Sequence, residues 1–115
     1  MSRQEAGNIF EMPHPLRADV ENVERLFGGP AVRIERIVST GQRTPGGEWF
    51  DQEWDEWVAL LEGTARLSLD DGTRIQMKAG DWIVLPAHQR HRVEETSSSP
   101  PCIWIAVHAK PVAPL

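Results

Sequence analysis

The sequence predicts a single all-β barrel with a short N-terminal helix. Its 115 residues are a common length for one domain. From residue 32 onward, apolar and polar residues alternate with a period near two, and turn signals recur roughly every 8 to 12 residues. These features divide the chain into an arm over residues 1–30, which carries the helix, and a barrel over residues 31–115.

The helix is expected over residues 19–27, packed against the outside of the barrel. Asp19 is a good N-cap, and Gly28 and Gly29 supply a left-handed stop. The residues that share one face at helical spacing are Val20, Val23, Leu26 and Phe27.

The strands are short apolar segments separated by turns. They are expected at residues 32–39, 56–61, 64–69, 73–77, 82–85, 91–94 and 102–108, with residues 49–52 also extended. The turns Glu62-Gly63, Asp70-Asp71-Gly72 and Ala79-Gly80-Asp81 favour three successive hairpins in one antiparallel sheet.

Composition excludes several classes of function. A net charge of -5 and a pI of about 5.3 disfavour nucleic acid as a partner. No apolar run is long enough to cross a membrane, and the N-terminus lacks the apolar core of a signal peptide, so we expect a cytoplasmic protein. Cys102 is the only cysteine, and neither G-x-S-x-G nor G-x-G-x-x-G occurs.

One strand carries polar residues on an otherwise apolar face. Period-two alternation places Gln52 and Glu56 on the side of Val58 and Leu60. A carboxylate above an apolar floor is costly unless a cation, a metal or a proton compensates it. His91 is the natural partner, because the arginines on either side of it would point outward.

The same residues resemble the cupin superfamily. Its first motif, G-x5-H-x-H-x3-4-E-x6-G, is matched by Glu56 and Gly63, with Gln52 at the second histidine position and Phe50 at the first. The resemblance covers roughly residues 32–108.

The second cupin motif, G-x5-P-x-G-x2-H-x3-N, is matched by Gly80, Pro86 and His91. His88 replaces its second glycine and Glu95 its asparagine. More narrowly, the chain looks like uncharacterised cupins with a W-[FY]-D-Q-x-x-D-E-W-V stretch, which stands here at residues 49–58.

The resemblance implies a double-stranded β-helix, or jelly-roll barrel, often dimeric and with a central metal site. Gln52, Glu56 and His91 would bind a divalent ion such as Mn, Fe, Ni, Co or Zn, weakly because three protein ligands are few. Asp51 replaces Gln52 if a bulge shifts the register, and the direction of His108 is left open.

Two functions are compatible with this pocket. The first is a metal-dependent isomerase, lyase or oxygenase acting on a small polar molecule. The second is a non-catalytic module that binds or senses such a molecule. Trp54 would line the pocket mouth and stack on a sugar-like ligand, and the strand at residues 32–39 offers an edge for a homodimer.

Overall fold

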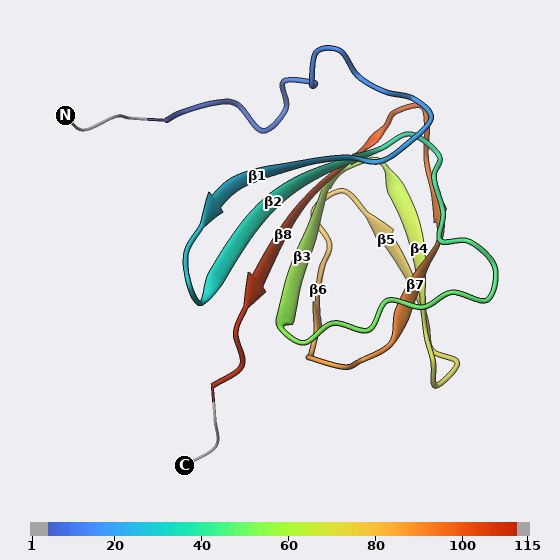
Figure 1. The fold of residues 1–115 in the computed structure, drawn as a ribbon. Coiled ribbons are helices and arrows are strands. Elements are labelled where there is room, and N and C mark those ends of the chain that lie inside the picture. The colour runs from blue at the N-terminus through green and yellow to red at the C-terminus, as the bar shows by residue number, and fades with distance from the viewer. Residues whose placement is uncertain (1–4, 113–115) are drawn as a thin grey trace.

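The computed structural model describes residues 5–112 and consists of two antiparallel sheets (Figure 1). One sheet has the strand order β1 (Asn22–Gly28), β2 (Val32–Ser39), β8 (Cys102–Ala109), β3 (Asp55–Glu62) and β6 (Trp82–Leu85). The other has the order β5 (Arg74–Lys78), β4 (Thr64–Leu69) and β7 (His91–Thr96). The predicted all-β fold is confirmed.

The seven strands predicted in the barrel are present, and each differs from its expected bounds by at most two residues at either end. Residues 49–52 form no strand of their own. They contribute one isolated bridge between Phe50 and His91, which fastens this loop to the start of β7.

The predicted N-terminal helix is wrong. No segment of residues 5–112 is helical, and hence none is a helix able to span a membrane. Residues 22–28 instead form β1, which pairs antiparallel with β2. A register irregularity between Arg25 and Phe27 interrupts the period-two alternation of side chains in β1. The apolar residues of this segment are therefore spaced in a way that also fits a helix.

Backbone pairing decides the conformation of this segment. Phe27 stays 57% exposed and Val23 54% exposed, so burial of the predicted apolar face contributes little. Pairing with β2 satisfies the backbone groups along one side of β1, a gain that the local sequence does not reveal. The same pairing covers the outer edge of β2, so residues 32–39 are no free edge for a dimer.

Two of the three predicted hairpins are also wrong. Only Asp70-Asp71-Gly72 joins neighbouring strands, β4 and β5. Gly63 connects β3 to β4 and Gly80 lies between β5 and β6, and both connections cross from one sheet to the other. A glycine turn signal marks where the chain reverses, but it does not specify whether the next strand stays in the same sheet.

The hydrophobic core fills the space between the sheets. Its fully buried members include Leu60, Met77 and Ala106. Burial of such side chains contributes roughly 1.5–3 kcal/mol each for the larger ones. Other core residues, among them Val58 and Trp104, also line a cavity, so the core serves as the cavity floor.

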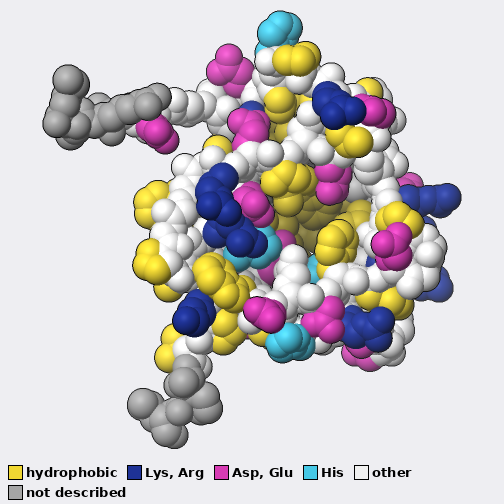
Figure 2. Space-filling view, viewed as in Figure 1, with side chains coloured by type: hydrophobic (Ala, Val, Ile, Leu, Met, Phe, Trp, Pro, Cys, Tyr) yellow, Lys and Arg dark blue, Asp and Glu magenta, His cyan; other side chains and the backbone are white. Residues whose placement is uncertain are grey.

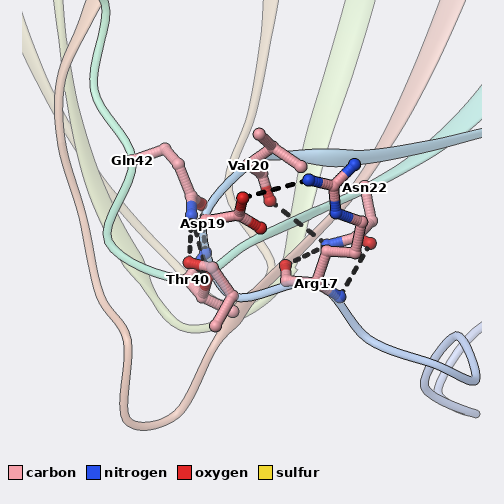
Figure 3. A network of polar contacts seen from close by, with 7 residues as sticks. Arg17, Asp19, Val20, Asn22, Thr40 and Gln42 are labelled. Atoms are coloured by element: carbon pink, nitrogen blue, oxygen red, sulfur yellow. Dashed lines mark hydrogen bonds and ion pairs between the residues drawn. The ribbon is translucent and has the colours of Figure 1, made fainter.

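A polar network holds the segment before β1 against the turn after β2 (Figure 3). The carbonyl oxygen of Ala18 accepts hydrogen bonds from Thr40 Oγ1 at 3.1 Å and Gln42 Nε2 at 2.9 Å. The Asn22 amide donates to the carbonyl of Arg17 at 2.8 Å. These contacts fix the start of β1 beside the barrel.

Gly63 lies in the tightest of the crossings. Its φ is +90°, and a Cβ there would lie 2.7 Å from Ser97 Oγ, 2.9 Å from Cys102 Sγ and 3.0 Å from Cys102 Cα. Gly72 has nearly the same φ, +92°, but a Cβ there meets nothing within 4 Å. A comparison of alanine substitutions at the two glycines therefore separates the cost of backbone strain from the cost of crowding.

Gly63→Ala should destabilise the protein by about 3 kcal/mol or more, because strain and a backbone clash add together. Gly72→Ala should cost only about 1–2 kcal/mol, from the left-handed conformation alone. Urea denaturation of the two variants provides the measurement. Equal losses of unfolding free energy in the two variants would contradict the additional cost that we attribute to crowding at Gly63.

Candidate functional site

A cavity of about 220 Å³ opens between the sheets. Figure 2 shows the hollow, with hydrophobic side chains on its floor and acidic, basic and histidine side chains around it. Eight residues contribute the apolar surface: Val23, Ile37, Phe50, Val58, Leu67, Leu85, Val93 and Trp104. The charged and polar lining residues are Glu21, Arg33, Glu35, Gln52, Glu56, His91 and His108.

Three of the polar residues form a row across neighbouring strands. Arg33 of β2 pairs with His108 of β8, and His108 also pairs with Glu56 of β3. Residues directly opposite each other in an antiparallel sheet present their side chains on the same face. The register of β2, β8 and β3 therefore brings a guanidinium, an imidazole and a carboxylate together at the cavity.

His91 reaches the cavity from the opposite sheet, at the first position of β7. Its side chain is buried, and its Nδ1 lies 3.1 Å from the carbonyl oxygen of Gln89. Because a carbonyl only accepts, Nδ1 carries the proton. The other ring nitrogen, Nε2, lies 3.8 Å from Glu56 Oε1, and the Phe50 ring stacks on the imidazole with centroids 5.4 Å apart.

Glu56 is the group whose acidity the fold changes most clearly. Burial raises its pKa to about 7, and the nearby Glu35 carboxylate adds to the increase. Arg33 opposes the shift without cancelling it. Both Glu56 oxygens lie too far from the imidazoles for a hydrogen bond, at 3.8 Å from His91 Nε2 and 3.9 Å from His108 Nε2. A carboxyl in this environment can hold or release a proton near neutral pH.

His108 faces the cavity beside a second carboxylate. Its Nε2 lies 3.2 Å from Glu35 Oε1, and its side chain is 4% exposed. Burial lowers the pKa of His108, as does the charge of Arg33, whereas Glu35 acts in the opposite direction. Burial also lowers the pKa of His91, so both imidazoles are neutral at pH 7.

The structure brings Glu56 and His91 together as expected, and Gln52 lines the same cavity. Asp51 lies elsewhere, exposed at the rim, where its Oδ1 contacts His88 Nδ1 at 2.8 Å. Within residues 5–112, no three His, Cys, Asp or Glu side chains form a group that could hold a metal ion. Metal binding by Gln52, Glu56 and His91 therefore stays a prediction.

The sequence reasoning missed Glu21, Arg33 and Glu35. Glu21 lies just before β1, in the region assigned to a helix, and its Oε1 accepts a hydrogen bond from Ser39 Oγ at 3.1 Å. Arg33 and Glu35 share the inward face of β2 with Ile37. The sequence did contain a signal for these residues. In a strand, Arg33 and Glu35 lie on the same face as the apolar Ile37, because side chains alternate with a period of two.

A second cavity of about 280 Å³ lies next to the first and shares Arg33, Gln52 and His108 with it. Glu53 and Trp54 complete its lining. The Arg33 guanidinium stacks over the Trp54 ring, 5.7 Å from its centroid. Trp54 thus lines this second cavity and not the inner one, and its stacking on a sugar-like ligand stays a prediction.

Glu56→Gln should change how stability depends on pH. Because the folded pKa is raised from 4.5 to about 7, the stabilising effect of the proton is complete below pH 4.5 and is lost as pH rises through 7. The glutamine variant has no proton to release at this position, so its stability does not fall in this way as pH rises. Its unfolding free energy relative to wild type should rise by about 2 kcal/mol between roughly pH 5.5 and 8.5.

Urea denaturation at the two pH values measures this difference. Glu48→Gln removes an exposed carboxylate as the matched control and should follow wild type. If Glu56→Gln also follows wild type, Glu56 has an ordinary pKa.

Comparisons with known proteins agree with this fold. A cupin domain model matches residues 37–108. A protein from Ralstonia eutropha JMP134, provisionally described as a mannose-6-phosphate isomerase, is similar with 37% identity and a TM-score of 0.87, over 94% of this chain and 100% of that one. No functionally curated protein matches.

Two more distant structures support the fold alone. A conserved protein of unknown function from Streptococcus pyogenes has 19% identity and a TM-score of 0.73, over 98% of this chain and 93% of its own. A cupin superfamily protein from Desulfitobacterium hafniense DCB-2 has 16% identity and a TM-score of 0.70, over 84% and 83%. The domain match and the Ralstonia structure, taken with the two-sheet barrel, show that the chain belongs to the cupin family.

Proposed function

We propose that the inner cavity binds a small polyhydroxylated molecule and that Glu56 acts on it as a general base. The observation that carries the proposal is the buried Glu56 carboxyl, with a pKa of about 7, beside two neutral imidazoles and above an apolar floor. A base of this strength is half deprotonated at neutral pH, where proton abstraction is most effective.

The lining favours hydroxyl groups. The Glu21, Glu35 and Glu56 carboxylates accept hydrogen bonds, whereas Trp104 and the aliphatic floor suit the C–H surface of a sugar ring. The Ralstonia protein, provisionally described as an isomerase of a sugar phosphate, supports the same class of ligand.

An aldose–ketose isomerisation uses these groups without any net oxidant. Glu56 takes the proton from the carbon next to the carbonyl, and His108, held by Glu35, donates a proton to the carbonyl oxygen. The resulting enediol gives the proton of its second hydroxyl, on the carbon that Glu56 deprotonated, to His108, and the former carbonyl carbon receives the proton held by Glu56. The carbonyl then stands one carbon further along, and both side chains regain their starting protonation.

Solvent deuterium exchange tests this chemistry. Hexoses and pentoses, free and phosphorylated, are incubated with the protein in D2O, and deuterium at the carbon next to the carbonyl is followed by NMR. Glu56→Gln should slow exchange by about 100-fold or more, because the base is lost. Glu48→Gln is the control and should exchange at the wild-type rate.

The outcomes separate enzyme from binding module. Absence of exchange with every sugar would overturn the general-base role. If sugars bind in that case, with affinities unchanged by Glu56→Gln, the cavity belongs to a non-catalytic sensor.

Weak binding of a divalent metal is the second function we propose for this pocket, through Glu56 and His91, with Gln52 as third ligand. One observation favours it: the His91 Nδ1 proton is bound to the Gln89 carbonyl, which leaves the Nε2 lone pair directed towards Glu56. Metal-binding histidines usually have this arrangement. Such an ion would polarise a ligand oxygen.

Elemental analysis by plasma mass spectrometry tests the metal proposal. Wild-type protein is expected to retain Mn, Fe, Ni, Co or Zn after loading with excess ion, whereas His91→Ala and Glu56→Gln should lose most of it. His88→Ala, which removes an exposed imidazole, is the control. Wild type that retains none of these ions would rule out a metal site.

A further inference from the structure

We infer that the outer cavity holds an anionic group of the same ligand, bound by Arg33 beside Trp54. This inference rests on the proposed function, because it extends the sugar-like ligand of the inner cavity. The two cavities meet at Arg33, Gln52 and His108. Each alone is smaller than most small-molecule sites, which begin near about 300 Å³, whereas the joined cavities reach that range.

Arg33 has hydrogen-bonding capacity that the fold leaves unused. Among residues 5–112 its guanidinium makes no hydrogen bond, and its Nε is buried without a partner. Glu35 Oε2 lies 3.7 Å from this Nε, close enough for charge attraction but too far for a hydrogen bond. The side chain is 36% exposed, so a ligand in the opening can reach it.

Trp54 lies against the guanidinium. The guanidinium carbon is over the ring, 5.7 Å from its centroid, and a cation–π contact of this kind uses none of the N–H groups as hydrogen-bond donors. Arginine edges bind phosphate and carboxylate with two parallel charge-assisted hydrogen bonds. The Gln52 amide, which lines both cavities, adds a neutral donor at the boundary.

Charge sets the direction of the ligand. Glu21, Glu35 and Glu56 line the inner cavity, so an anion would be repelled there. The outer cavity has only Glu53 as a carboxylate, and that side chain is exposed to water. The hydroxyl-bearing end therefore lies inward, at Glu56, and the phosphate or carboxylate lies outward, at Arg33.

Calorimetric titration with matched sugars tests this assignment. The probes are mannose, mannose 6-phosphate and mannuronate, titrated into wild type, Arg33→Met, Arg33→Lys and Arg74→Met. Arg74 is an exposed arginine on β5, so its variant is the control for net charge. Wild type and Arg74→Met should bind at least one anionic sugar about tenfold or more tightly than mannose.

Arg33→Met should reduce that ratio to near one while mannose still binds, and Arg33→Lys should keep part of the preference. Preference for mannose 6-phosphate indicates a phosphate ligand, and preference for mannuronate a carboxylate. An unchanged ratio in Arg33→Met, or a wild type that does not distinguish mannose from either anion, would overturn the anion site alone. Failure of all three sugars to bind would overturn the proposed function as well.

Discussion

The pairing of β8 with both β2 and β3 is the constraint on which the whole pocket depends. It sets Arg33, His108 and Glu56 side by side, although they come from widely separated parts of the chain. A slip of β8 by one residue would turn His108 to the opposite face of the sheet, away from Arg33 and Glu56, because strand side chains alternate. The chemistry of the cavity is therefore a property of the register.

Within that row, burial dominates the electrostatics. Arg33 lies close enough to favour the charged form of Glu56, yet desolvation and the Glu35 carboxylate raise the pKa of Glu56 to about 7. The two imidazoles respond in the opposite direction and stay neutral. The cavity thus keeps the proton acceptor Glu56 and the proton donor His108 side by side without a permanent ion pair between them.

The strands of the barrel and the Glu56–His91 pair could be predicted from the sequence, because alternation and motif spacing are local signals. The positions of Arg33 and Glu35 could not, since they depend on how distant strands align. The helix predicted at the N-terminal segment was wrong for a related reason, because the conformation of this segment also depends on pairing with another strand. Its irregular spacing resembles a helix, and only the free backbone groups of β2 make it a strand.

The central place of β8 also bears on how the molecule acquires its pocket. β8 follows both of its neighbours in the chain, and its contacts with β2 span most of the sequence. Such long loops close slowly, so folds rich in distant pairings assemble in milliseconds to seconds. The raised pKa of Glu56 therefore depends on a pairing that joins distant parts of the chain, so no short local segment can produce the reactive carboxyl by itself.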